Sequence, residues 1–255
     1  MKLASLHSPR RVLSAAVAML GALAASAAQC ATPTPFSARY EVLIDGKRAG
    51  EASLELQAEG TRWRHSLRAI GTRGLARLAG FTTDQSSLLD WPGERPRLLG
   101  AHMRSESLLR DREASVSFDW TQGMLTWSGD ISDGEPRSRP IEGTPATGSS
   151  LNLQLALEVE SRQPGDVVPF VMHDRGRARA VDYRVADPED VDVPYGRLRA
   201  TPIIGQRPHS DRVTTAWYAA ALPPTPVRLL QTEHGENKYE LRLMDVKPAA
   251  VDGTR

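Results

Sequence analysis

The stretch from Val213 to Val246 constrains the fold of this chain most strongly. It contains three short apolar runs, Val213–Ala219, Val227–Glu233 and Lys238–Val246. The last run alternates between Tyr239, Leu241 and Leu243 on one side and Lys238, Glu240 and Arg242 on the other. Alternation with a period of two predicts a strand with one buried and one solvated face. The end of the chain is therefore predicted to be an antiparallel meander, with a tight hairpin at His234–Asn237, whose Gly and Asn tolerate a positive φ.

The N-terminal half shows the same alternation. Phe36–Ile44, Glu51–Gln57 and Arg62–Ile70 each place apolar side chains at every second position. Asp45-Gly46 and Glu59-Gly60 separate these runs and are typical of hairpin turns. The sequence therefore predicts a second meander of three strands.

The middle of the chain predicts more strands and little helix. Further strands are expected at Thr82–Leu89, Arg97–Glu106, Glu113–Trp120, Met124–Ser128, Val167–His173, Arg177–Val185 and Leu198–Ile204. Helical spacing predicts a short helix or lid within Gly71–Phe81. The good helix formers of Leu151–Val159 favour a second helix, capped by Ser149 or Ser150, although its alternating leucines would also suit a strand. Gly129–Thr147, rich in Gly and Pro, is predicted to be a long exposed loop. The predicted fold is mainly β: a strongly curved antiparallel sheet or open β-barrel with one or two short helices.

Residues 1–30 have the order of a secretory signal peptide. A basic region precedes an apolar run from Val12 to Ala24, and small residues follow from Ala25 to Ala28. The apolar run is short for a membrane span. The sequence predicts cleavage of residues 1–30, a single β-rich domain at 31–255, no transmembrane segment after cleavage, and a location in the periplasm. The alternative is an N-terminal anchor helix that stays in place.

Cys30, the sole cysteine, lies in the cleavage zone and allows a second interpretation. The mature chain would then begin with a lipidated cysteine and be an outer-membrane lipoprotein. A lipoprotein signal places a large aliphatic residue three positions before the cysteine and a small residue directly before it. Ala27 and Gln29 occupy these positions, so ordinary cleavage fits the sequence better.

The net charge argues against a general nucleic-acid-binding function. The chain has 32 basic and 31 acidic residues, and the leader holds three of the basic residues and none of the acidic ones. The remaining chain therefore carries 29 basic against 31 acidic residues. A nearly neutral domain offers no broad basic field to a nucleic acid.

Three motifs occur in a familiar order: Tyr40–Gly46 with Gly50 after it, Val193–Ala200, and Trp217–Arg228. With these motifs the chain resembles the bacterial exported proteins grouped as domain-of-unknown-function family 3108, from about Phe36 to Val246. The resemblance implies an exported β-rich domain and brings no agreed activity, cofactor or catalytic residue. The closing strands are also similar in layout to periplasmic lipoprotein carrier proteins, which fold as a curved antiparallel sheet over an apolar cavity. A shared layout does not establish a shared function.

The polar residues do not predict a catalytic or metal site. The chain lacks G-x-S-x-G, and the members of His209-Ser210-Asp211 are neighbours that point to opposite sides of an extended chain. The histidines lack metal-binding spacing, and His65 is predicted to be a hydrogen-bonded core residue. Asp187–Asp192 and the basic tip Arg175–Arg179 are predicted to be solvated turns, in preference to a cation site and a lipid-phosphate contact. We predict no cofactor and no metal.

The large aromatic residues of the buried faces are the candidate ligand-binding residues: Tyr40, Trp63, Phe118, Trp217 and Tyr239. They line an apolar cavity or simply fill a β core, and the sequence leaves both open. A sheet too large for one helix to cover favours the cavity. We therefore predict a non-enzymatic envelope protein that binds an apolar or amphipathic, lipid-like ligand or an envelope protein. A hydrolase with an unrecognised site and a structural adaptor are the alternatives.

Overall fold

The computed structural model describes residues 33–93, 95–108, 111–206 and 210–248, all within one compact unit that spans Ala31–Arg255. These ranges contain sixteen strands and two short helices. The strands are β1 (Phe36–Ile44), β2 (Lys47–Glu59), β3 (Arg62–Gly71), β4 (Thr82–Asp90), β5 (Arg97–Glu106), β6 (Arg112–Asp119), β7 (Met124–Gly129), β8 (Ser138–Pro140), β9 (Pro145–Ala146), β10 (Val167–Asp174), β11 (Arg177–Val185), β12 (Glu189–Val193), β13 (Gly196–Gln206), β14 (Val213–Tyr218), β15 (Pro226–Glu233) and β16 (Glu236–Pro248). The helices are α1 (Gly74–Leu78) and α2 (Leu151–Val159).

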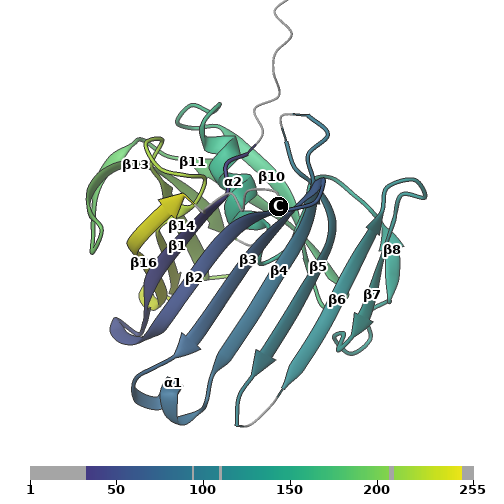
Figure 1. The fold of residues 1–255 in the computed structure, drawn as a ribbon, viewed down its shortest axis with the longest axis horizontal. Helices are drawn as coiled ribbons and strands as arrows, with labels where there is room; N and C mark the ends of the chain where they lie inside the picture. The colour runs from purple at the N-terminus through teal and green to yellow at the C-terminus, as the bar shows by residue number, and fades with distance from the viewer. Residues whose placement is uncertain (1–32, 94, 109–110, 207–209, 249–255) are drawn as a thin grey trace, which may run out of the picture. The chain divides into compact units, whose positions relative to one another are not determined.

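One strongly curved sheet contains every described strand (Figure 1). Its order is β8-β7-β6-β5-β4-β3-β2-β1-β16-β15-β14-β13-β11-β10-β9, and β12 pairs with β13 beside this path. The first and last strands of the chain, β1 and β16, pair in the middle and join the two predicted meanders. Within the described residues the end strands β8 and β9 do not pair with each other, so the sheet stays open. The prediction of a mainly β protein with a curved or open barrel is confirmed.

The two predicted hairpins beside the β1–β16 pair have the backbone that their sequences favour. Asp45 and Gly46 have φ values of 46° and 74°, and His234 and Gly235 have 51° and 80°. Two successive left-handed residues give a turn whose twist matches that of the flanking strands. Both hairpins therefore favour antiparallel pairing of the strands that they join, and each pair shifts its register once near the turn.

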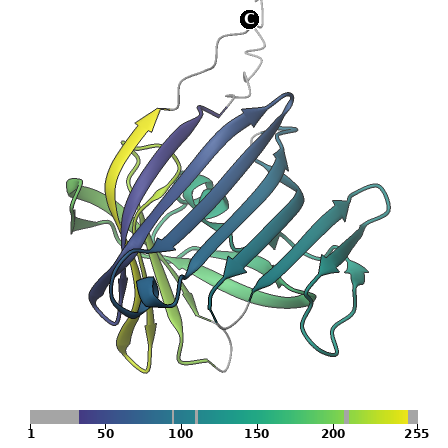
Figure 2. The ribbon, with the colours of Figure 1, turned by 60° about the horizontal axis from the view of Figure 1, so that its bottom comes forward.

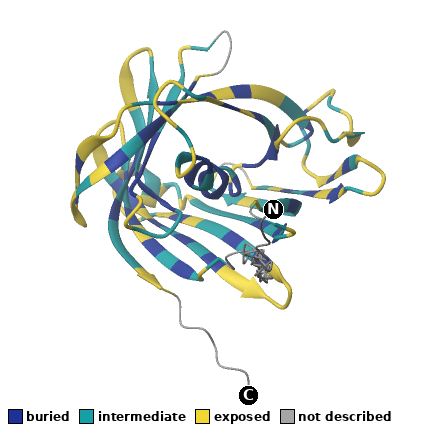
Figure 3. Cartoon of the chain, turned by 90° about the horizontal axis from the view of Figure 1, so that it is seen from above, coloured by how far each residue is buried: buried dark blue, intermediate teal, exposed yellow. Residues whose placement is uncertain are grey.

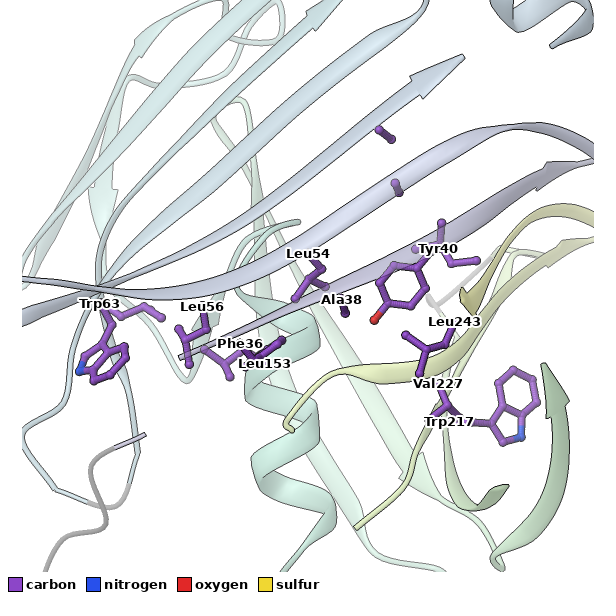
Figure 4. Close-up of a cluster of buried hydrophobic side chains, with 14 of the residues drawn as sticks. Phe36, Ala38, Tyr40, Leu54, Leu56, Trp63, Leu153, Trp217, Val227 and Leu243 are labelled. Atoms are coloured by element: carbon purple, nitrogen blue, oxygen red, sulfur yellow. The ribbon is translucent and has the colours of Figure 1, made fainter. Parts of the chain in front are cut away.

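Helix α2 lies inside the curve of the sheet and is buried on most sides (Figure 3). Leu153 packs into the larger core cluster with residues such as Phe36 and Leu56, whereas Leu155 and Ala156 pack into a second cluster (Figure 4). The predicted helix and its N-cap at Ser150 are confirmed, but the capping hydrogen bond is not formed. Ser150 stands at the N-cap without a side-chain capping bond, because its hydroxyl instead accepts a hydrogen bond from the backbone N–H of Thr147 at 2.9 Å.

Two segments that were predicted to be loops belong to the sheet. The predicted loop Gly129–Thr147 contains β8 and β9, and its last three residues are buried. The predicted solvated turn Asp187–Asp192 largely forms β12, where Asp190 lies 3.0 Å from Arg197. Strands of two to five residues are too short to show a clear period, and pairing with a strand elsewhere satisfies their backbone groups.

Leu243→Ala should lower the free energy of unfolding by about 2–5 kcal/mol, because Leu243 is fully buried in the larger core cluster. Arg242 faces the other side of β16, where its side chain is 34% exposed and lies 3.3 Å from Glu41. Arg242→Ala should therefore cost about 0.5 kcal/mol or less. Urea unfolding of both variants measures the difference, and equal losses would contradict the register of β16.

Candidate ligand-binding cavity

A cavity of about 620 Å³ lies on the inner side of the sheet, beside the N-terminal end of α2. Its wall draws on both halves of the sheet and on the helix, with Val42 of β1, Leu67 of β3, Met103 of β5, Met172 of β10, Leu229 of β15 and Leu151 of α2. Its volume lies within the range of about 300–1,000 Å³ that is usual for small-molecule sites. Its mainly apolar lining suits a hydrocarbon chain.

The cavity exists because α2 is too short for the sheet around it. A helix of nine residues spans about 13 Å, whereas strands of nine to thirteen residues span about 30–44 Å. Core side chains from the middle of α2 fill one end of the interior, and Leu151 and Asn152 face the space that is left. Small residues line that space and do not fill it: Ala49, Gly50, Ala69, Gly71 and Ala76.

The mouth of the cavity has an apolar rim. Ile44, Ile70 and Phe81 line the cavity, although 41%, 39% and 39% of their surfaces are exposed. Leu78 of α1 and Leu108 do not line the cavity but are exposed, at 71% and 78%, and the Leu108 backbone N–H donates to the carbonyl of Ala79 at 2.9 Å. Figure 2 shows α1 at the end of the sheet where β3 finishes and β4 begins.

Four charged side chains also line the cavity: Arg112, Arg175, Arg212 and Asp174. Arg212 forms a pair with Glu233, with its Nη2 3.3 Å from each carboxylate oxygen. The cavity wall is therefore amphipathic and carries more positive than negative charge. The sequence prediction that the tip Arg175–Arg179 is a solvated turn is wrong for Arg175, whose side chain is only 19% exposed.

A side chamber of about 250 Å³ adjoins the main cavity and shares Gln85, Met103, Gly148 and Met172 with it. His173 lies on its wall with 2% of its surface exposed, and its ring meets that of Phe118 edge-on at 5.9 Å. No described residue forms a hydrogen bond with either ring nitrogen. Burial and, secondarily, the charge of Arg139 lower the His173 pKa to about 4, so the ring is neutral at pH 7.

The family described as a protein of unknown function, DUF3108, matches residues 36–242. The chain belongs to this family. No curated protein sequence matches it. The predicted resemblance is therefore confirmed, and membership in DUF3108 brings no assigned activity or ligand.

Solved structures show where the DUF3108 chain stands among known folds. The crystal structure of a β-barrel-like protein of family DUF1849 from Brucella abortus matches it with a TM-score of 0.50 at 12% identity, over 86% of this chain and 99% of that chain. A provisionally named exported protein with a YmcC-like fold from Bacteroides fragilis matches at 12% identity over 84% of this chain and 94% of that chain, with a TM-score of 0.30. The first likeness supports the barrel-like fold and says nothing of function.

The structure places one of the five predicted ligand-binding residues, Tyr239, on the cavity wall. Trp63 and Phe118 belong to the larger core cluster, where the ring centroids of Trp63 and Trp91 lie 6.3 Å apart. Tyr40 is fully buried beside Leu243, and its hydroxyl pairs with Thr225 Oγ1 at 2.6 Å and donates to the carbonyl of Pro226 at 2.9 Å (Figure 4). Cys30, the predicted lipidation site, lies outside the described residues.

Trp217 is buried on the other face of β14 from the cavity residue Thr214. Its indole N–H donates to Glu189 of β12 at 2.6 Å, and the Arg228 guanidinium lies 4.9 Å from its ring centroid. The sequence could not show this arrangement, because it did not predict β12, the strand that covers the outer face of β14 at Trp217. Trp217 consequently does not touch the cavity that the sequence analysis assigned to it.

The residues considered for catalysis are not brought together. His209 lies outside the described residues, and the Ser210 hydroxyl accepts a hydrogen bond from the Arg212 backbone N–H at 3.2 Å. Asp211 lies 3.0 Å from His234, but both side chains are at least 70% exposed and neither lines the cavity. Within the described ranges, no three His, Cys, Asp or Glu residues form a metal-binding group, and neither helix is long and apolar enough to cross a membrane.

Sequence reasoning missed the polar residues of the cavity, above all Arg112, Gln85 and Asn152. Arg112 is the first residue of β6 and lies just outside the predicted strand Glu113–Trp120, so the sequence pattern assigned it to neither face. One signal was nevertheless present. Gly and Ala at inward positions of β2 and β3, such as Gly50 and Ala69, mark a wall that its own side chains leave unfilled.

The stability of the protein should fall as the pH is lowered from 7 to 5. His65 is fully buried, its Nδ1 donates to the carbonyl of Ser149, and burial lowers its pKa to about 4, as for His173. Because both folded-state pKa values lie below the unfolded value of about 6.5, the unfolded state takes up protons first, and each histidine removes up to about 1.4 kcal/mol per pH unit. This loss begins near pH 6.5 and continues to about pH 4.

Urea unfolding at several pH values measures this slope. His65→Asn retains a side-chain N–H for Ser149 and should make the slope shallower than that of the unmodified protein. An unaltered slope in His65→Asn would contradict the neutral, buried imidazole.

Proposed function

We propose that this protein is a non-enzymatic, exported cell-envelope protein that holds the apolar chain of a lipid-like ligand in the 620 Å³ cavity. The observation that carries the proposal is the cavity itself. Small-molecule sites are concave, mostly apolar and of this volume, so a hollow of this size on the inner side of the sheet is a candidate binding site. The apolar rim at its mouth gives a hydrocarbon chain a continuous path inward.

The wall chemistry supports an alkyl or acyl chain over a compact polar substrate. Leu67, Leu229 and Leu241 supply rigid apolar surface, and Met103 and Met172 supply side chains that adapt to different shapes. Burial raises the pKa of Tyr239, so this residue stays neutral and offers its hydroxyl as a hydrogen-bond donor inside the cavity.

A fluorescent long-chain fatty acid should bind the delipidated mature protein saturably. Thr214→Trp places a large side chain in the cavity and should weaken binding by about tenfold or more, because it displaces the chain from the space that it occupies. Thr215→Trp is the matched control, because Thr215 is the next residue of β14 and faces the other side. Titration of both variants, with folding checked by circular dichroism, distinguishes occupation of the cavity from adsorption to the surface.

Two outcomes would contradict the proposed ligand class. Equal binding by both tryptophan variants and the unmodified protein would place the fatty acid outside the cavity. No binding by the folded, delipidated protein across several chain lengths would exclude this ligand class. The exposed apolar side chains of Ile44, Ile70, Leu78, Phe81 and Leu108 would then favour the structural-adaptor alternative, with an envelope protein as the partner.

The proposal includes removal of the leader. We expect the mature protein to begin between Gln29 and Ala31 and to be recovered from the periplasmic fraction, because residues 1–30 have the order of a signal peptide. N-terminal sequencing and intact-mass measurement of the exported protein test this expectation. Recovery of Met1 would contradict cleavage, and a diacylated Cys30 would instead establish the lipoprotein alternative.

A further inference from the structure

We propose that Arg112 and Arg175 form an anion-binding subsite in the wall of the cavity, which holds the carboxylate or phosphate headgroup of a single-chain amphiphile. This inference rests on the proposed function and adds the chemical class of the ligand. It is based on the pairing, burial and position of the charged residues that line the cavity.

Arg112 is a cavity residue without a counterion. It opens β6 and lines the cavity, and its Nε is buried without a hydrogen-bond partner. Within the part of the chain that the structure describes, no carboxylate forms an ion pair with its guanidinium. An arginine side chain stays protonated, and a partly desolvated guanidinium gains most from an anion that meets its planar array of donors.

Arg175 approaches the cavity from the other end of the open sheet. It lies in the turn between β10 and β11 with a φ of 43°, and its side chain is 19% exposed. Its Nε lies 3.8 Å from Asp174 Oδ1, which is longer than a hydrogen bond. Since the Asp174 side chain is 62% exposed, water screens this contact and Arg175 keeps most of its capacity to bind an anion.

A short segment links the backbone of Glu113, the neighbour of Arg112, to that of Arg175. The Asp130 backbone N–H donates to the carbonyl of Glu113 at 2.7 Å, and the Glu113 N–H donates to the Asp130 carboxylate at 2.9 Å. Two residues later, the Ser132 N–H donates to the carbonyl of Arg175 at 2.8 Å. Because two residues span at most about 7 Å, this bridge brings the neighbour of Arg112 close to Arg175 across the gap between the ends of the sheet.

The remaining charges of the wall favour an anion over a neutral or cationic headgroup. Arg212 is already paired with Glu233, and Asp174 is the single carboxylate among the described residues that line the cavity. The two arginines of the subsite therefore give the polar side of the wall an excess of positive charge. Guanidinium groups bind carboxylates and phosphates with two parallel hydrogen bonds, so either headgroup matches the subsite while its chain follows the apolar wall.

The test compares a long-chain fatty acid, the alkyl phosphate and the fatty alcohol of the same chain length on the delipidated mature protein. The unmodified protein should bind the two anions at least about tenfold more tightly than the alcohol, and Arg112→Gln and Arg175→Gln should each remove most of this preference. Binding of the alcohol should change little in both variants. Arg73→Gln, an exposed residue next to α1 that does not line the cavity, is the control with the same loss of charge.

The outcomes separate this inference from the function on which it rests. If the acid and the alcohol bind equally well, or if Arg73→Gln weakens the anions as much as Arg112→Gln does, the subsite is refuted and the cavity remains a lipid site. If none of the three probes binds the folded protein, the proposed function itself fails. The tighter of the two anions identifies the headgroup. If Arg112→Gln does not fold, the subsite is tested by Arg175→Gln and by the salt dependence of binding. A charged subsite should lose its preference for the anions over the alcohol in this variant and at high salt.

Discussion

The pairing of β1 with β16 is the interaction on which the structure depends. It runs from Phe36 opposite Pro248 to Ile44 opposite Tyr239, with one irregularity between Arg39 and Tyr40. It joins two meanders that would otherwise be separate sheets, and it holds Val42 and Leu241 side by side on the cavity wall. Because its partners stand at opposite ends of the chain, their contact closes the longest loop in the molecule and must be supported by local hairpins on both sides.

The interior follows from a mismatch between the elements that enclose it. Sixteen strands make a surface that one nine-residue helix cannot cover, so α2 supports the core at one end and leaves a hollow at the other. Small inward residues such as Ala69 keep the hollow open, while full-sized side chains such as Leu54 and Leu56 fill the core next to it. The cavity is therefore a regular consequence of the strand and helix lengths.

Much of the fold could be predicted from the sequence, because alternation and turn residues act locally. The bounds of β1, β5, β11 and α2 agree with the predicted ranges, and the buried, hydrogen-bonded His65 was expected from its place on an apolar face. The site was less accessible, because a period of two distinguishes the faces of a strand but does not tell what covers each face. Trp217 illustrates this limit: β12 covers it, and that strand has too few residues to show a pattern. Arg112 shows the same limit. Its proposed role depends on the absence of a counterion among the described residues, which a sequence pattern does not reveal.

The open edge between β8 and β9 bears on how the radius of this barrel-like sheet can change. In a closed barrel, the number of strands and their stagger fix the radius, and a larger guest requires a different barrel. Here no ladder closes the described sheet, and the segment around Asp130 and Ser132 links Glu113 of β6 to Arg175, in the turn between β10 and β11, through a few hydrogen bonds. A change in the length of that segment would alter the separation of these two parts of the sheet without altering a single strand pairing.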